Sequence, residues 1–348
     1  MARNKKARQN WQVALTYVGT VIGAGFASGQ EILRFFGVFG LWGLVGALLA
    51  GLMFALLGQA IIEAAANQGA NNYEQFIRYL FGKKAVWFDG IITLFLLAGL
   101  AAMLVASGSL FAQVFGATLW KGFLFAALFI YIILLMGIEG MLWFNTLFVP
   151  GLIIVCLAVA VLGINEAGLS LIAVEQSAAM LKDSWLLGAF LYVAYNLVLG
   201  MVILVSLEDR TKRTCSNGGV IGGIILGFMA AIMCAALISQ GQEVTGRSIP
   251  MLALAQKINP ALGACYNLAL WIAIFTTALS NGAGLLKRLE SKVKWPRPML
   301  AGLILLPTII FVNWPLAKMV GIIYPLLGYV GLIIIIAVII KLKPFVNT

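Results

Sequence analysis

Ten long apolar runs, each close to the length of a membrane-spanning helix, dominate this sequence. A bilayer core about 30 Å thick takes about 20 helical residues to cross, whereas barrel strands would show short alternating segments. Of the 348 residues, 62% are hydrophobic and 10% are charged, and a water-soluble fold could not bury so much apolar surface. The sequence therefore predicts an all-α integral membrane protein with ten transmembrane helices. They are expected over residues 11–36, 38–66, 85–115, 120–138, 141–163, 185–207, 217–240, 260–287, 298–313 and 316–340.

Basic residues gather in every second segment between these runs, which is the pattern that orients a membrane protein. Of the 23 Lys and Arg residues, 17 fall in the segments 3–8, 78–84, 210–213, 287–297 and 341–343. The positive-inside rule then places both termini in the cytoplasm. The membrane is expected to be a bacterial-type cell inner (plasma) membrane. Orientation thus explains the net charge of +11, and no nucleic-acid partner is expected. A cleaved signal peptide at residues 3–27 is the alternative, but its removal would leave that charge bias without its N-terminal part.

The chain lacks the residue types that most enzymes and metal centres need. It contains no His, and its four Cys form no Cys-x-x-Cys pair, which excludes His-ligated zinc, bis-His haem and a His base. The sequence offers no nucleophile–base constellation and no Asp-Asp-x-x-Asp cluster either. An intramembrane enzyme is therefore disfavoured, and no resident cofactor is expected.

The spacing of the runs suggests an internal duplication. The first five start 174 to 179 residues before the last five, and a near-constant offset is typical of a repeat. Because five is odd, the second copy would enter the membrane from the opposite face, as in many secondary transporters. We therefore expect one transporter domain over 1–348, with inverted repeats at 11–163 and 185–340. Helices of similar length could also give such offsets by chance.

The first run contains four Gly within the eleven residues 19–29, followed by Gln30 and Glu31. Such a segment is a poor helix, and unwinding frees backbone groups that a membrane tolerates only beside a cavity or ligand. Close helix packing through small residues is the alternative, but it does not account for the two polar residues. We expect helix 1 to be discontinuous, with a substrate carboxylate bound where its second half begins. The residues expected there are Gly23, Ala24, Gly25, Phe26 and Ala27.

The sixth run carries a weaker signal at its middle, where Tyr195 and Asn196 interrupt apolar residues. Asn196 could cap a half-helix or bind a ligand, so a discontinuous helix 6 is also expected. A hydrogen bond from Asn196 to a neighbouring helix is the alternative. Asn281 in the eighth run and Gly99 in the third complete the candidate substrate site.

The segment 19–31, Gly-Thr-Val-Ile-Gly-Ala-Gly-Phe-Ala-Ser-Gly-Gln-Glu, resembles the opening of the YkvI-type membrane proteins. These belong among the amino acid–polyamine–organocation transporters, which have the fold of the bacterial leucine transporter, and the resemblance extends over all ten runs. It implies a secondary active transporter that moves a small amino acid or related zwitterion by alternating access. A non-transporting ligand sensor on the same fold, similar to permease-like germinant receptor subunits, is the alternative. The expected partners are the lipid bilayer and a small-molecule substrate, with the chain a monomer or weak homo-oligomer.

The resemblance also implies a sodium site between helices 1 and 8, with sodium as the coupling ion. Sodium is a hard cation that favours oxygen ligands, and the eighth run offers the adjacent hydroxyls of Thr276 and Thr277. The resemblance assigns the remaining ligands to the backbone carbonyls of Gly19, Ile22 and Ala273. A threonine in a membrane helix often bonds its own backbone instead, which is the alternative for either residue.

Glu31, Arg34 and Phe35 are candidate gating residues. Proton-coupled relatives can place a Lys of helix 5 where sodium would lie, and residues 141–163 contain no Lys or Arg, which favours sodium. Glu31 keeps proton coupling open, although we favour an ion pair between Glu31 and Arg34, three residues later. Arg34-Phe35 also resembles an outer gate of the family, but the acidic partner of that gate is missing from 316–340.

Overall fold

The structure is a computed structural model that describes residues 2–70, 72–170, 172–173, 184–207, 217–240, 242–314 and 316–342. Throughout these residues the regular structure is helical, without a β-strand. The basic segment 210–213 and Lys343, which contribute to the predicted orientation, lie outside the described residues. The all-α architecture expected from the long apolar runs is confirmed.

The first predicted span is a broken helix. It consists of α1 (Ala2–Val21), the short α2 (Ala24–Ser28) and α3 (Gln30–Phe35). Gly23 is extended, with φ −91° and ψ −170°, and Gly29 has a positive φ of 85°, which is the left-handed region that glycine tolerates best. The predicted discontinuity is therefore confirmed, and it occurs at two of the four glycines.

The remaining predicted spans each coincide with a helix. In chain order these helices are α4 (Leu41–Gln68), α6 (Ala85–Phe115), α7 (Leu119–Leu135), α8 (Gly137–Ala167), α9 (Trp185–Ser206), α11 (Gly218–Ile238), α14 (Pro260–Lys292), α15 (Arg297–Leu305) with the 3-10 helix η3 (Leu306–Phe311), and α16 (Leu316–Leu342). Shorter elements connect them: η1 (Gly37–Phe39), α5 (Tyr73–Phe81), η2 (Gly82–Lys84), α12 (Gln242–Thr245) and α13 (Pro250–Ile258). Six segments of the described chain are long and apolar enough to cross a membrane. The count of ten crossings, like the division into repeats 11–163 and 185–340, stays a prediction.

The prediction of a discontinuous helix 6 is wrong, because α9 runs unbroken from Trp185 to Ser206. Between Gly188 and Gly200 this segment contains neither Gly nor Pro, so no residue there weakens or removes a helical hydrogen bond. The side chain of Asn196 caps nothing. Its Nδ2 donates to the carbonyl of Tyr192, one turn earlier in the same helix, at 3.0 Å.

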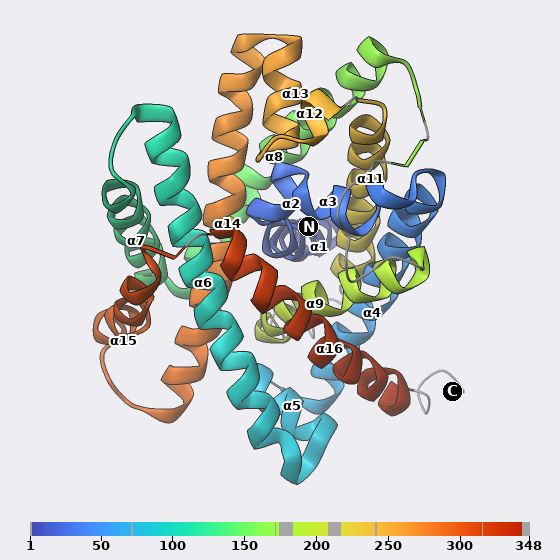
Figure 1. The fold of residues 1–348 in the computed structure, drawn as a ribbon. Helices are drawn as coiled ribbons and strands as arrows, with labels where there is room; N and C mark the ends of the chain where they lie inside the picture. Colours follow the sequence, from blue (N-terminus) through green and yellow to red (C-terminus); the bar gives the residue numbers. More distant parts are fainter. Residues whose placement is uncertain are drawn as a thin grey trace.

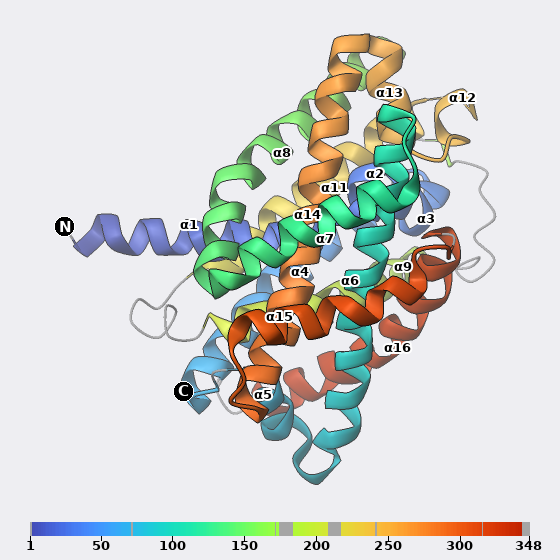
Figure 2. The same ribbon diagram turned by 90° about the vertical axis from the view of Figure 1, so that its left-hand side faces the viewer.

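The broken helix lies at the centre of the molecule, with α4, α8, α9, α11 and α14 around it (Figure 1). Viewed from the side, α6 and α14 lie next to each other and α7 and α15 cross them on the outside (Figure 2). Helices α4 and α11 touch through glycine, since a Cβ on Gly51 would overlap the backbone of Gly227. This close packing surrounds α1–α3 with a dense apolar shell.

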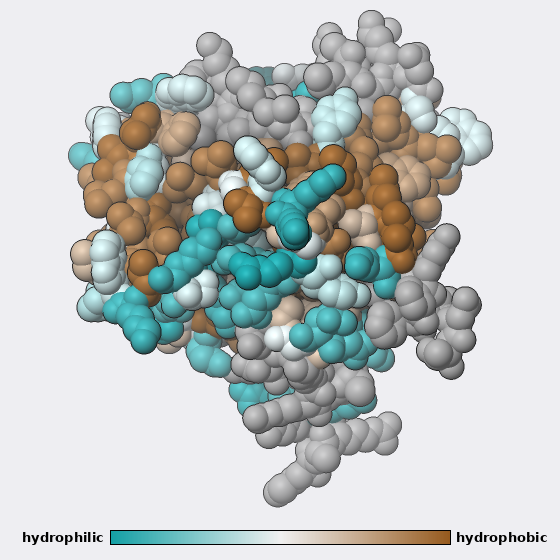
Figure 3. All heavy atoms as spheres, turned by 90° about the horizontal axis from the view of Figure 1, so that it is seen from below, coloured by the Kyte–Doolittle hydropathy of each residue, from teal (hydrophilic) through white to brown (hydrophobic). Residues whose placement is uncertain are grey.

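The outer surface is apolar where a bilayer would cover it. Large hydrophobic side chains such as Leu56, Leu128 and Ile154 are at least 60% exposed. Seen from below, hydrophilic residues gather across the middle of the face, and hydrophobic residues cover much of the upper part of the view (Figure 3). Exposed apolar side chains on this scale are typical of a protein whose solvent is lipid.

Candidate ion and substrate site

The break after α1 leaves three backbone carbonyls without their helical donors. In a continuous helix the N–H groups of Gly23, Ala24 and Phe26 would bond the carbonyls of Gly19, Thr20 and Ile22. Instead the N–H of Gly23 bonds the carbonyl of Val21 at 2.9 Å, and the chain turns away. The three freed oxygens remain buried in the protein and require other partners.

The hydroxyl of Thr277, on α14, is the group that meets these carbonyls. Its Oγ1 lies 3.3 Å from the carbonyl oxygens of Gly19, Thr20 and Ile22 alike. A hydroxyl carries one hydrogen and can donate to one of them at a time. Four neutral oxygens therefore converge at a buried point between α1 and α14, and neutral or anionic oxygens are the ligands that hard cations prefer.

The other predicted sodium ligands, Ala273 and Thr276, also lie on α14. The Oγ1 of Thr276 donates to the carbonyl of Ala273 at 3.0 Å, so Thr276 bonds its own helix and not α1. A second link between the helices comes from Thr20 and Ser280, whose hydroxyl oxygens are 2.7 Å apart. The structure thus brings Gly19, Ile22 and Thr277 together in one cluster, while Thr276 and Ala273 bond each other beside it.

Asn145 of α8 is a neighbour of this cluster that the sequence analysis missed. A Cβ on Gly19 would lie 2.9 Å from Asn145 Oδ1, so the amide packs directly against α1. The residue has no exposed surface, and within the described chain neither its Oδ1 nor its Nδ2 has a hydrogen-bond partner. A polar residue inside an apolar span is the sequence signal that marks such a residue.

Glu31 lies at the other side of the break, on α3. Its side chain is 6% exposed, and its Oε2 accepts a hydrogen bond of 2.6 Å from the hydroxyl of Tyr195 on α9. Its Oε1 packs against Gly25 of α2, where a Cβ would overlap the carboxylate. Arg34 is exposed, and no ion pair joins it to Glu31 among the described residues. The favoured Glu31–Arg34 pair is therefore wrong, and Tyr195 takes the place of Arg34.

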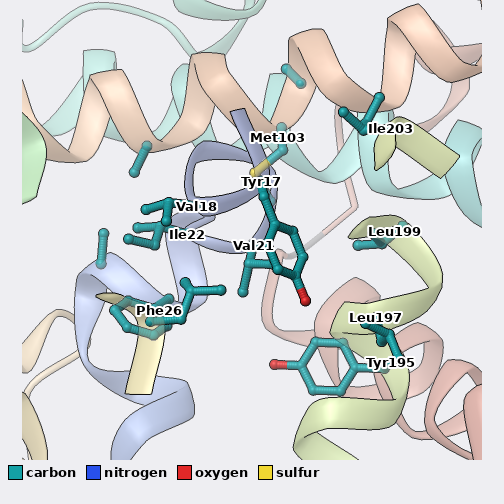
Figure 4. Packing of buried hydrophobic residues seen from close by; sticks show 14 of the residues in the cluster. Tyr17, Val18, Val21, Ile22, Phe26, Met103, Tyr195, Leu197, Leu199 and Ile203 are labelled. Carbon is teal, nitrogen blue, oxygen red and sulfur yellow. The ribbon is translucent and has the colours of Figure 1, made fainter. Parts of the chain in front are cut away.

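Aromatic rings pack against Tyr195, which bonds this carboxylate. The ring of Phe35 lies 5.4 Å from that of Tyr192 and 5.7 Å from that of Tyr195. Tyr195 projects from α9 toward α2, and Phe26 lies beside Val18 and Ile22 (Figure 4). Two of the three predicted gating residues, Glu31 and Phe35, thus lie in one cluster with Tyr195, while Arg34 faces outward.

The predicted substrate-binding residues of the segment 23–27 differ in accessibility. Ala24 and Gly25 are partly exposed, whereas Gly23, Phe26 and Ala27 are buried. The carbonyl of Ala27 accepts a 2.6 Å hydrogen bond from Tyr266 of α14, a contact that the sequence did not indicate. The accessible surface of the break is therefore at Ala24 and Gly25, next to Glu31.

Gly99 and Asn281 meet between α6 and α14. A Cβ on Gly99 would lie 2.7 Å from Asn281 Nδ2, and that amide nitrogen is buried without a partner in the described chain. Asn196, by contrast, bonds within α9 and makes no hydrogen bond to another predicted ligand. The roles given to all of these residues in binding stay predictions.

Relatives found by sequence identify the family. No protein-family model matches the chain. Over 340 residues it is 31% identical to the membrane protein YkvI of Bacillus subtilis (strain 168), covering 96% of each protein. The chain belongs to the YkvI-type membrane proteins. The protein YyaD of the same organism is 22% identical over 333 residues, which is 95% of this chain and 96% of YyaD.

Solved structures of similar shape establish the fold of this YkvI-type protein. MhsT in complex with L-phenylalanine matches with a TM-score of 0.69 at 17% identity, over 93% of this chain and 87% of MhsT. Mhp1, a nucleobase-cation-symport-1 family transporter, matches with a TM-score of 0.66 at 16% identity, over 92% and 77% of the two chains. A Na⁺-coupled sialic acid symporter gives 0.66 at 12% identity, over 92% and 76%. The YkvI-type chain is thus a multi-pass membrane protein with the leucine-transporter fold.

Proposed function

We propose that this YkvI-type protein is a secondary active transporter that couples inward sodium movement to uptake of a small amino acid or related zwitterion. The observation that carries the proposal is the convergence of three freed carbonyls of α1 on the hydroxyl of Thr277. Sodium would bind among the carbonyls of Gly19 and Ile22 and the Thr277 hydroxyl. Thr276 and Ala273 would complete the shell once the Thr276 hydroxyl turns from its own helix toward α1.

The position of these oxygens explains how sodium binding could be coupled to substrate binding. The same break that frees the carbonyls of Gly19 and Ile22 also begins α2, whose first residues carry the accessible surface. A cation bound at the end of α1 would fix the position of α2, and a ligand at Ala24 and Gly25 would then bind a preformed surface. Two ligands that stabilise one arrangement of the break must favour each other's binding, and a symporter needs this property.

The fold supports this choice of function. MhsT was crystallised with L-phenylalanine, and the sialic acid symporter is Na⁺-coupled. We place the protein in a bacterial-type plasma membrane with both termini in the cytoplasm, on the charge distribution of the sequence, and we expect a monomer or weak homo-oligomer. Alternating access would come from movement of one group of helices against the other around the broken α1–α3 segment.

Uptake into proteoliposomes tests the proposal. The purified chain, reconstituted with an inward sodium gradient, is expected to accumulate at least one radiolabelled amino acid, and equal potassium is expected not to drive uptake. Thr277→Val removes the hydroxyl among the carbonyls and is expected to lower sodium-driven uptake by about tenfold or more. Thr308→Val is the matched control, because Thr308 is equally buried but bonds only the Leu305 carbonyl of its own helical segment.

Three results would overturn the proposal. Uptake that ignores sodium would remove the coupling ion, and equal sodium dependence in Thr277→Val and Thr308→Val would remove the site. Tight binding of an amino acid without counterflow would instead indicate the ligand sensor, which binds its ligand without moving it.

A further inference from the structure

Two acidic residues of the described chain are buried, Glu31 and Asp89, and their surroundings differ. Asp89 is paired with Arg288 and Lys292. Glu31 accepts one hydrogen bond from a neutral tyrosine hydroxyl, and no Lys or Arg lies within ion-pair distance of it in the described part of the chain. Burying a carboxylate that has no cation beside it costs free energy. That cost falls when the carboxylate takes up a proton or when a positively charged group binds to it.

The elements packed around Glu31 hold no basic side chain that serves this need. Arg34, on the same helix, is exposed. Neither α9 nor α11 contains a Lys or Arg. Arg247, whose carbonyl accepts a hydrogen bond from Gln30 at the start of α3, donates from its Nε to the carbonyl of Glu243, and Lys257 of α13 donates to Gln240. None of these described side chains forms an ion pair with Glu31, so a cation that pairs with it would come from outside this cluster.

The carboxylate also lies where an incoming molecule can reach it. Its Oε1 is against Gly25, and Gly25 and Ala24 are the partly exposed residues of the break. Tyr195 holds Oε2 at 2.6 Å and so fixes the direction of the group, while Oε1 lies against the partly exposed Gly25. An anchored carboxylate beside an accessible surface is suited to bind a primary ammonium, which has three donors and no acceptor.

We propose that Glu31 binds the ammonium group of the transported molecule, so that the substrate class is defined by a primary amine. This rests on the proposed transport function and adds to it a requirement on the ligand. Recognition then depends on the amine more than on the carboxyl group, so a decarboxylated amine binds and a deaminated acid binds much more weakly. Sodium would bind separately, among the neutral oxygens around Thr277.

Binding by the purified full-length chain tests this. Each of the twenty standard amino acids is first tried with sodium by thermal shift, and every one that stabilises the protein is compared with its decarboxylated and deaminated analogues by calorimetry. For leucine these are 3-methylbutylamine and 4-methylpentanoate. The amine is expected to bind and the acid to bind at least about tenfold more weakly. Glu31→Gln is expected to weaken binding of the amino acid and of the amine by about 100-fold.

Controls separate this result from misfolding and from failure of the transport proposal. Glu63→Gln makes the same change in an exposed carboxylate that bonds Gln59 on α4, and it is expected to bind as the unaltered protein does. Sodium should still raise the melting temperature of Glu31→Gln, which shows that the variant is folded, and Glu31→Asp should recover part of the binding. If no amine-bearing ligand binds the unaltered protein, both proposals fail.

Two further outcomes would overturn the ammonium proposal alone. Equal binding of the amino acid by Glu31→Gln and the unaltered protein would show that the carboxylate does not hold the amine. Tight binding of the deaminated acid would show that the site selects the carboxyl group. In the first case, loss of the response of uptake to a proton gradient in Glu31→Gln would show that Glu31 carries a proton in place of the ammonium.

Discussion

The two buried carboxylates of this protein occupy opposite kinds of surroundings. Asp89 of α6 accepts two hydrogen bonds from Arg288 of α14, at 2.9 Å and 2.6 Å, and a third from Lys292 at 3.4 Å. Lys292 also lies 3.6 Å from Glu74, so the pairing reaches α5. Glu31 has a single neutral partner.

This difference indicates which part of the protein is structurally fixed and which part changes when a ligand binds. A bidentate Arg–carboxylate pair is satisfied within the chain and joins α6 to α14 in one geometry. In the described chain, by contrast, no Lys or Arg lies within ion-pair distance of the Glu31 carboxylate, and the Asn145 amide has no hydrogen-bond partner. We infer that the paired region is a fixed joint and that the unpaired region is completed by what the protein binds.

Breaking the paired region should give the largest loss of stability. Arg288→Met leaves Asp89 buried with Lys292 as its remaining cation, and we expect the free energy of unfolding to fall by about 3 kcal/mol. Glu31→Leu breaks no ion pair. We expect it to lower the free energy of unfolding by about 1 kcal/mol at most, because only the hydrogen bond with Tyr195 is lost. Denaturant titration in detergent measures both. Equal losses in the two variants would contradict the comparison, because they would make Glu31 as structural as Asp89.

The sequence predicts the break in helix 1 because its cause is local. Glycines at positions 23 and 29 lie within the segment that unwinds, so composition alone indicates the event. The prediction for helix 6 failed for the converse reason. A single Asn inside an apolar run finds an acceptor one turn away in its own helix, as Asn196 does, and no break is needed.

The partners of the site residues could not be predicted in the same way. Arg34 is near Glu31 in sequence, but the residue that bonds Glu31 is Tyr195, 164 positions away. Thr277 meets Gly19 across 258 positions, and that meeting was expected only through the family resemblance. Spacing along one helix shows which residues share a face, but which helix covers that face is a property of the packed fold.

Asn145 offers a test in which stability and function should move in opposite directions. Its amide is fully buried without a partner in the described chain, which costs about 1–3 kcal/mol. Asn145→Val should therefore raise the free energy of unfolding by about 1 kcal/mol or more while reducing the stabilisation that sodium gives. Melting temperatures with sodium and with equal potassium measure both effects. A variant that is less stable and still responds fully to sodium would show that the amide only packs.

Gly25→Ala tests whether the ligand binds at the partly exposed surface beside the Glu31 carboxylate. The added Cβ would overlap the Glu31 carboxylate and push it from Gly25, while Tyr195 holds the other oxygen. We expect amino-acid binding to weaken by about tenfold, with a smaller effect on stability because the end of the Glu31 side chain can move. Gly90→Ala is the matched control, since a Cβ there meets no atom within 4 Å. Calorimetry should separate the two variants, and equal binding by both would place the ligand away from Gly25.

The smallest effect is expected from Tyr195→Phe, which keeps the ring and removes one hydroxyl. The Glu31 carboxylate would lose its 2.6 Å hydrogen bond but keep its charge and its place beside Gly25. If Tyr195 orients the carboxylate and the carboxylate binds the ammonium, ligand affinity should fall by only about fivefold, equivalent to about 1 kcal/mol. Tyr195→Phe combined with Glu31→Gln should then bind no more weakly than Glu31→Gln alone, because the hydroxyl acts through the charge that has been removed. Additive losses in the double variant would instead show that the Tyr195 hydroxyl contacts the ligand itself.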